Sequence, residues 1–287
     1  MDKKTMSVNK IILGDNLKIL KTLESESIDL MYLDPPFFSN RNYEVMWGDA
    51  GEVCSFKDRW EEGIDHYIGW LKERIKEMYR LLKPTGSLFL HCDWHASHYI
   101  KVDILDKLFG MNKFRNEIIW CYTGPGSPNM RQFNRKHDSI FWYSKGNEWV
   151  FNRNDIIIPY KDGSPHHGGF IEKTGKRLNP HEYQKGKVPE TWWVDIALAI
   201  RSSKERIGYP TQKPEKLLER IIQCASNEGD TVLDPFVGSG TTIAVAERLN
   251  RHWIGIDQSA MAVKITKLRL QKQNVCGYTL INIDDTY

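Results

Sequence analysis

The chain alternates between strand-like and helix-like segments along most of its length, and this alternation constrains its fold more than any other feature. Strands are predicted where short apolar runs end in glycine, proline or aspartate, and helices where apolar residues recur every three or four positions. The predicted strands are 10–15, 27–34, 87–93, 116–122, 139–145, 231–236 and 252–257, and the predicted helices are 16–23, 64–82, 96–108, 209–226, 241–249 and 260–271. This order predicts an α/β fold with a mostly parallel sheet and helices on both faces.

The alternation breaks down over residues 151–206, which are rich in Gly, Pro, His, Lys and aromatic residues and keep no period. This stretch is unlike a low-complexity linker, because Trp192 and Trp193 could still be buried. We therefore predict one α/β domain in two parts, residues 1–150 and 207–287, with residues 151–206 as an inserted region.

The distribution of charge is more informative than the net charge of +3. From Gly124 to Glu215 there are 15 Lys and Arg against 10 Asp and Glu, a local balance of +5 that leaves −2 for the rest of the chain. This asymmetry favours a basic face suited to nucleic acid, the alternative being a lysine-rich solvated insert.

The cysteines and the apolar runs predict the compartment. The five cysteines are scattered and form no CxxC pair, which favours a reduced cytosolic protein without disulfides or a zinc site. No apolar run approaches the ~20 residues needed to span a bilayer, and the polar start MDKKTMSVNK is unlike a secretory signal. A cytoplasmic protein is expected.

The first chemical motif is the sequence VLDPFVGSGTTIAVAERL, which is followed by WIGID. Gly238 and Gly240 open a helix directly after a strand, so a ligand can approach the backbone closely. Asp257 ends the next strand, where a carboxylate could accept ribose hydroxyls. The loop lacks the lysine of a triphosphate-binding loop, and Ile243 at the third glycine position disfavours a pyrophosphate. An adenosyl ligand without phosphate, S-adenosylmethionine (SAM), and a structural turn without a ligand both remain open.

The second motif lies within LMYLDPPFFSN, residues 30–40, where Asp34, Pro35, Pro36 and Phe37 follow the end of a predicted strand. A DPP sequence alone indicates a proline-stiffened turn. Because the carboxyl ends of parallel strands meet at one edge of a sheet, this block and the glycine loop should lie together and form a ligand site.

With these two motifs in this order, the chain resembles the DNA amino-methyltransferases, specifically the N6-adenine enzymes of the β arrangement. In that class the DPP(Y/F) block precedes the target-recognition region and the SAM loop comes last. The segments GDNL, LLKPTGSLFLHCD, FRNEIIW, HDSIFWYSK and PTQKP are similar to further blocks of the family, so the resemblance covers nearly the whole chain except residues 151–206. One departure is Phe37 where tyrosine is commoner, and stacking does not need the hydroxyl.

The resemblance implies a Rossmann-like SAM-dependent methyltransferase fold with an inserted target-recognition region at 151–206. It implies a site-specific enzyme that transfers a methyl group from SAM to N6 of an adenine flipped out of duplex DNA. Methylation of cytosine C5 is excluded, because it needs a nucleophilic cysteine that in that family follows a proline, and no cysteine here follows one.

The catalytic block implied by the resemblance is Asp34, Pro35, Pro36 and Phe37. Asp34 and a carbonyl fixed by the two prolines, that of Pro35, would accept the two amino hydrogens of adenine, so that the lone pair of N6 points at the methyl sulfonium. Phe37 would stack on the extruded base. In-line transfer then needs positioning and no covalent enzyme intermediate.

The resemblance assigns a second set of residues to SAM. The glycine loop and its flanks would contact the methionine part, Asp257 the ribose, and the PTQKP block the methionine carboxylate, near a helix N-terminus that favours an anion. The complete predicted set is Asp15, Asp34, Thr211, Gln212, Lys213, Phe236, Gly238, Ser239, Gly240, Thr241 and Asp257, and no metal is expected.

DNA is expected to lie against the inserted region, mostly through phosphate contacts that position it without reading its sequence. The predicted contacts are Arg153, Lys173, Lys176, Arg177, Lys185, Lys187, Arg201, Lys204 and Arg206. Residues 40–63 are predicted to be polar loop material that closes over the flipped base as a flap. His166 and His167 lack further ligands at suitable spacing, which favours a loop over a metal site.

Double-stranded DNA is the expected partner, at the nucleoid, together with a second copy of the chain and a cognate restriction endonuclease encoded nearby. Cytosine-N4 transfer is the nearest alternative, although it usually has serine in place of Asp34. RNA or protein-glutamine methylation shares an (N/D)PP(Y/F) pocket but is disfavoured by the inserted region and the block order. A subunit that only senses SAM or binds DNA is the alternative from another class, and neither motif is damaged in a way that supports it.

Overall fold

The computed structural model describes residues 9–39, 60, 62–124, 130–159, 186–199 and 205–283, together with the backbone of 41–47 and 52–58. Of the predicted DNA contacts, Lys173, Lys176, Arg177, Lys185, Arg201 and Lys204 lie outside these residues, as do His166 and His167.

The described chain is built on a nine-stranded sheet with the order β11-β1-β10-β9-β2-β5-β7-β6-β8. Neighbours from β11 to β5 run parallel, and β7 runs antiparallel to both β5 and β6. The mostly parallel α/β sheet predicted from the sequence is confirmed. The strands are β1 (Lys10–Leu13), β2 (Ile28–Leu33), β5 (Leu82–Cys92), β6 (Phe114–Cys121), β7 (His137–Ser144), β8 (Trp192–Trp193), β9 (Thr231–Asp234), β10 (His252–Asp257) and β11 (Thr279–Asn282).

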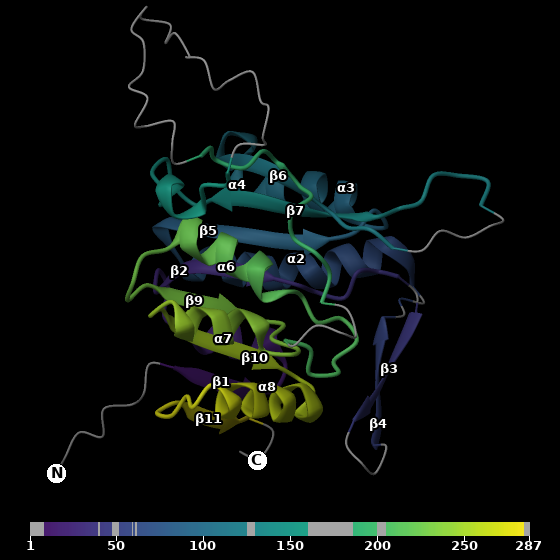
Figure 1. Cartoon of the computed structure of the whole chain (residues 1–287), viewed down its shortest axis with the longest axis vertical. Helices are drawn as coiled ribbons and strands as arrows, with labels where there is room; N and C mark the ends of the chain where they lie inside the picture. The colour runs from purple at the N-terminus through teal and green to yellow at the C-terminus, as the bar shows by residue number, and fades with distance from the viewer. Residues whose placement is uncertain are drawn as a thin grey trace, which may run out of the picture.

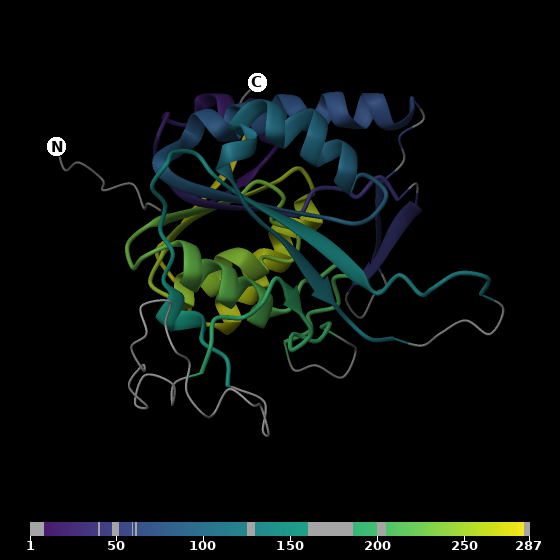
Figure 2. The same cartoon turned by 90° about the horizontal axis from the view of Figure 1, so that it is seen from above.

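Helices cover both faces of this sheet (Figures 1 and 2). One face carries α6 (Glu215–Ala225), α7 (Thr241–Arg248) and α8 (Ala260–Lys272). The other carries α1 (Asn16–Thr22), α2 (Gly63–Leu81) and a helix divided into α3 (Ser97–Tyr99), the π-helical η1 (Ile100–Leu105) and α4 (Asp106–Phe109). Short 3₁₀ turns, η2 (Met111–Lys113) and η3 (Arg153–Ile156), complete the described helical elements.

The pattern of buried residues explains why these elements pack as three layers. Helix α2 buries Tyr67, Leu71, Ile75 and Met78, spaced three or four residues apart, so one stripe of the helix faces the sheet. Strand β2 buries nearly every residue, as expected for a central parallel strand covered on both faces. Two separate apolar clusters result, one on each face of the sheet.

The prediction of a polar loop over residues 40–63 is wrong. The backbone forms an antiparallel hairpin of β3 (Arg41–Trp47) and β4 (Glu52–Asp58), in register from Arg41–Asp58 to Trp47–Glu52. Tyr43 and Val45 alternate with Asn42 and Glu44, a two-residue period typical of a strand. The hairpin projects at the carboxyl edge of the parallel strands (Figure 1).

Three smaller boundaries also differ from prediction. Strand β5 starts at Leu82, five residues early, and takes up the extra residues by a register shift against β2. Helix α6 starts only at Glu215, because Pro214 is its N-cap residue. Strand β11 was not predicted, although it pairs with β1 over four residues.

The described end of the inserted region is part of the main body. Strand β8 pairs with β6, Trp193 and Ile196 are buried in the core, and the Trp120 Nε1 donates to the Ile196 carbonyl at 2.8 Å. Burying two such side chains contributes about 3–6 kcal/mol. Ile158 and Lys187 exchange backbone hydrogen bonds, so the described residues 151–159 and 186–199 meet at this bridge.

Candidate active site

The carboxyl ends of the parallel strands bring aspartates to one edge of the sheet. Asp34 follows β2, Asp93 follows β5, Asp234 ends β9 and Asp257 ends β10. Parallel strands that end together place three of these side chains, those of Asp34, Asp234 and Asp257, around a common space. A cavity of about 530 Å³ opens there, within the range of pockets that bind small molecules.

Both sequence motifs contribute to this cavity. Of the residues predicted for catalysis or cofactor binding, the lining includes Asp34, Pro35, Pro36, Phe37, Thr211, Lys213, Phe236, Gly238, Ser239, Thr241 and Asp257. Asp15, Gln212 and Gly240 do not line it. The structure therefore brings together the segment after β2 and the glycine loop after β9. The other three predicted residues lie outside the cavity lining.

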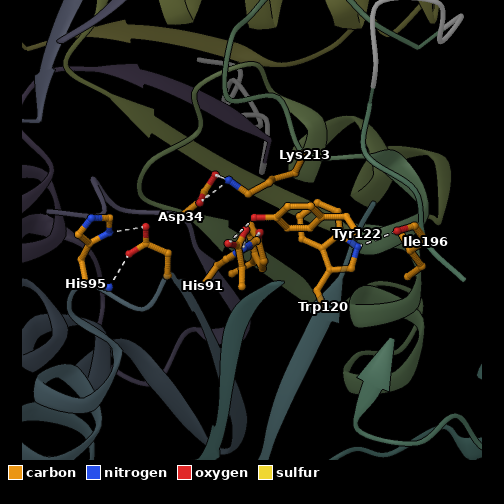
Figure 3. A network of polar contacts seen from close by, with 10 residues as sticks. Asp34, His91, His95, Trp120, Tyr122, Ile196 and Lys213 are labelled. Atoms are coloured by element: carbon orange, nitrogen blue, oxygen red, sulfur yellow. Dashed lines mark hydrogen bonds and ion pairs between the residues drawn. The ribbon is translucent and has the colours of Figure 1, made fainter. Parts of the chain in front are cut away.

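Asp34 forms an ion pair with Lys213. The lysine Nζ lies 2.8 Å from Oδ1 and 2.6 Å from Oδ2 of Asp34, and 4.9 Å from the centre of the Phe37 ring (Figure 3). The sequence assigned Lys213 to the cofactor carboxylate, and the structure places its ammonium on the catalytic block instead. Its contact with the cofactor stays a prediction.

The two prolines fix the backbone after Asp34. The Pro36 carbonyl accepts a hydrogen bond from the Tyr67 hydroxyl at 2.7 Å. Within the described residues no donor reaches the Pro35 carbonyl, which is thus available as an acceptor at the cavity. The proline pair and Tyr67 together hold this corner rigid.

The glycine loop between β9 and α7 is held by backbone and side-chain contacts. The Asp257 carboxylate accepts the Gly238 and Ser259 backbone N–H groups, each at 2.9 Å. Burial raises the pKa of Asp257, and these hydrogen bonds offset part of that effect. Gly240 has a φ of +74°, and a Cβ there would lie 2.7 Å from the Thr266 hydroxyl, so a glycine is required.

Asp234 is a cavity-lining carboxyl group that the sequence reasoning missed. It is 2% exposed and accepts the Phe236 backbone N–H at 3.0 Å and a hydrogen bond from the Thr242 side chain. Burial raises the pKa of Asp234 to about 7, and the hydrogen bonds offset only part of the shift. Its position at a strand end beside the glycine loop was the signal that could have found it.

Asp15 does not face the cavity, because it is used within the fold. Its carboxylate caps α1 through the Lys18 N–H and pairs with Arg74 at 2.9 Å. Arg74 also donates to Asn16 Oδ1 at 2.7 Å and lies over the Trp70 ring. Arg74, Asn16 and Trp70 line the cavity in place of Asp15. No local pattern predicts this, because α1 and α2 meet only in the folded chain.

A buried polar network lies behind Phe37. His91 is fully buried, with its ring 5.5 Å from that of Phe37. Since the Asp138 carboxylate can only accept, His91 Nε2 donates to it at 3.0 Å, and His91 Nδ1 accepts from the Tyr32 hydroxyl at 2.7 Å. The Tyr122 hydroxyl donates to the other oxygen of Asp138 at 3.0 Å (Figure 3).

The charge state of this network follows from its contacts. Burial by itself raises the pKa of Asp138, but the His91 hydrogen bond and the charge of Lys213 outweigh it, so the pKa lies below its ordinary value. Burial, followed by the charge of Asp138, raises the pKa of Tyr122. The network therefore keeps an ionised carboxylate and a neutral phenol beside the pocket.

Three of the predicted DNA contacts are among the described residues. Arg153 is exposed on η3, Lys187 pairs with Glu190, and Arg206 donates to the Ala199 carbonyl at 3.4 Å. Two exposed aromatic side chains, Trp94 after β5 and Phe133 between β6 and β7, were not predicted. The centre of the Trp94 ring lies 3.8 Å from the centre of the His95 ring and 3.8 Å from Arg135 Cζ, and Phe133 is 97% exposed.

The described residues contain no group of three or more His, Cys, Asp or Glu side chains placed to hold a metal ion. None of their helices is both long and apolar enough to cross a membrane.

Known proteins are similar to this chain over most of its length. A family model described as DNA methylase, for N6 and N4 methyltransferases, matches residues 28–268. The chain is 34% identical to type II methyltransferase M.HpaI of Haemophilus parainfluenzae, over 92% of this chain and 74% of that protein. It is also 34% identical to DNA adenine methyltransferase YhdJ of Escherichia coli, over 91% and 82% of the two chains.

Solved structures share the fold. The M1.HpyAVI–SAM complex is 25% identical, with a TM-score of 0.56 over 91% of this chain and 98% of that one. The cytosine-N4-specific PvuII DNA methyltransferase is 18% identical, with a TM-score of 0.65 over 96% of each chain. At that identity the second likeness concerns the fold alone.

Proposed function

The chain belongs to the DNA methylase family of SAM-dependent methyltransferases, and from this premise we propose that it methylates N6 of adenine at a specific site in duplex DNA. The observation that carries the proposal is the meeting of Asp34, Pro35 and Phe37 with the glycine loop in one cavity. An acceptor site for an amino group and a cradle for an adenosyl ligand are thereby adjacent.

The cavity fits SAM on two observations. The loop after β9 presents backbone at Gly238, where no Cβ obstructs a ligand, and the carboxyl group of Asp257, at the end of the neighbouring strand β10, lines the same cavity. When bound, SAM supplies a methyl group activated by a sulfonium. We infer that Phe236, Gly238, Ser239 and Thr241 hold its methionine part.

Four further residues complete the proposed cofactor site. Asp257 would accept the ribose hydroxyls with the lone pairs that its backbone donors leave free. Thr211 and Lys213 line the cavity. Gln212 is buried and bonds the Ile207 N–H and the Glu205 carbonyl, so its proposed part is to shape the segment that carries them.

On the base side, Asp34 and the Pro35 carbonyl would accept the two hydrogens of the adenine amino group. This arrangement directs the nitrogen lone pair away from the ring and toward the methyl group. Phe37 is backed by His91 and would present its other face to the base. After transfer the product nitrogen carries an extra proton, and Asp34 is the carboxylate placed to accept it.

DNA would approach the carboxyl edge, because a base must leave the duplex to reach Asp34. Hairpin β3–β4 and the described residues 130–136, between β6 and β7, both lie at this edge (Figure 1). We propose that residues 151–206 supply most of the phosphate contacts and divide the α/β domain into 1–150 and 207–287. A second copy of the chain, a cognate restriction endonuclease and a location at the nucleoid are parts of the same proposal.

Long-read sequencing of DNA from cells that express the protein tests the function, with Asp34→Ala as the matched variant. N6-methyladenine at one recurring sequence, absent with the variant, is the expected result and gives the recognition site. N4-methylcytosine at one recurring sequence would instead identify cytosine as the substrate base. Absence of both modified bases from cells with folded, SAM-binding protein would contradict DNA as the substrate.

A further inference from the structure

The side chain of Lys213 extends from the cofactor side of the cavity to the base side. Its backbone carbonyl accepts a hydrogen bond from the Thr241 hydroxyl at 3.3 Å, at the first residue of α7 after the glycine loop. Its ammonium contacts both oxygens of Asp34, 179 residues away in sequence. The lysine and aspartate side chains are 11% and 18% exposed, so bulk water weakens their attraction little.

The ammonium lies where the structure would receive a substrate amino group. It donates to the carboxylate that the proposed mechanism assigns to the adenine amino group, and it lies over the ring on which the base would stack. The fully buried His91 packs against Phe37 from within the protein, whereas Lys213 and Phe37 both line the cavity. Lysine and base therefore compete for the same carboxylate and the same ring face.

Resting on the proposed function, we propose that Lys213 is a positioning residue that occupies the acceptor site for the target amino group until the base enters. Its charge stabilises Asp34 in a half-buried pocket, where an unpaired carboxylate is costly. The ammonium must move from the face of Phe37 before a base can stack there and bring an adenine N–H to the carboxylate. The flexible four-carbon stem allows the ammonium to move within the cavity.

Removal of the ammonium should therefore make capture of an extruded base easier in the absence of cofactor. The measurement uses a duplex with the target adenine in place and 2-aminopurine as the next base, whose fluorescence rises when the adenine leaves the stack. We expect Lys213→Met and Lys213→Gln to reach half-maximal fluorescence at about tenfold lower protein concentration than wild type, which corresponds to roughly 1.4 kcal/mol.

Two variants distinguish competition from general loosening of the site. Lys213→Arg keeps a cation that can pair with Asp34 and should keep capture as weak as in wild type. Lys83→Met removes a lysine paired with Asp29 at 2.8 Å, at the opposite end of the strand that leads to Asp34, and should not change capture. Melting temperatures of all variants verify that folded proteins are compared.

Wild-type methylation of the same duplex with tritiated SAM is measured in parallel. If wild type forms N6-methyladenine but capture by both neutral variants is unchanged or weaker, the role of Lys213 is overturned and the proposed function stands. Stronger capture in Lys213→Arg as well would also overturn it, because charge would then be irrelevant. If wild type forms no N6-methyladenine, the proposed function fails and this inference fails with it.

Discussion

The tripeptide Leu-Asp-Pro occurs at the ends of two neighbouring parallel strands, as Leu33-Asp34-Pro35 after β2 and Leu233-Asp234-Pro235 after β9. Asp34 is paired with Lys213 and faces the cavity beside two prolines. Asp234 is almost fully buried, is bonded to a backbone N–H and a threonine, and has a pKa raised by burial to about 7. Identical local sequence thus yields an ion-paired acceptor after β2 and a largely desolvated carboxyl group after β9.

The difference comes from the residues on the C-terminal side of each tripeptide. A second proline after β2 stiffens the chain and keeps Asp34 at the surface of the pocket. The glycines after β9 turn the chain sharply into α7, which brings Thr242 onto Asp234. We therefore expect substitutions in the segment after β2 to change the reaction rate. Substitutions in the segment after β9 should change stability and cofactor binding.

The largest effect is expected from Asp34→Asn. Replacing the carboxylate by an amide removes the acceptor for the amino hydrogen and for the released proton, and should lower kcat by roughly 10²–10⁴-fold. The dissociation constant for SAM should barely change, as measured by calorimetry beside single-turnover methylation. A parallel loss of SAM affinity would mean that the two segments do not divide their roles in this way.

Asp234→Asn should change the dependence of stability on pH. Because the pKa of Asp234 in the folded protein is near 7 and that of an unfolded aspartate is near 3.9, the folded state retains a proton that the unfolded state loses between these values. The wild-type free energy of unfolding should therefore fall as the pH rises through this window, by about 3 kcal/mol from about pH 5 to pH 8.

Urea unfolding of wild type and Asp234→Asn at both pH values isolates this contribution, since asparagine does not titrate. The stability of the variant relative to wild type should increase with pH. A difference between the two proteins that is the same at both pH values would mean that burial does not raise the pKa of Asp234.

Gly240→Ala tests the glycine loop itself, with Gly229→Ala as its control. Both glycines have positive φ, +74° and +81°, but only at Gly240 would a Cβ meet other atoms, those of Thr266 at 2.7–3.0 Å. We expect Gly229→Ala to lower the free energy of unfolding by about 1 kcal/mol through backbone strain. Gly240→Ala should cost roughly 2–3 kcal/mol and also weaken SAM binding. Equal losses would mean that Thr266 moves aside freely.

The order of strands and helices could be predicted because the buried strands are short apolar runs, whereas the amphipathic helices repeat apolar residues every three or four positions. Hairpin β3–β4 was missed because its charged residues make the stretch resemble a polar loop. Strand β8 was missed because a strand of two residues is too short to show an alternation. The meeting of the two motifs was predictable from the rule that parallel strands end at one edge. The same rule applies to Asp234, which ends the parallel strand β9, but Asp234 was not among the predicted residues.

Other parts of the site could not be predicted from sequence. Lys213 is 179 residues from Asp34, and nothing local indicates whether its ammonium turns to the cofactor or to the base. Arg74 lines the cavity because α1 and α2 pack together, which makes Asp15 its partner. Such pairings depend on which segments meet in the folded chain, and a single sequence does not contain that information.

The smallest effect is expected at the phenylalanines next to the two tripeptides, Phe37 and Phe236. Both line the cavity, but Phe37 lies against His91 and Phe236 against Trp70. Phe37→Tyr retains the ring face that would stack on the base, so kcat/KM for DNA should change by only about threefold or less, whereas Phe37→Ala should lose about 1–3 kcal/mol of base stacking.

Phe236→Ala should instead raise the KM for SAM and leave the KM for DNA unchanged. Steady-state kinetics with each substrate varied in turn separate these outcomes. If Phe37→Tyr is as damaging as Phe37→Ala, the added hydroxyl disturbs the base site, and stacking alone does not explain the aromatic residue in the segment after β2.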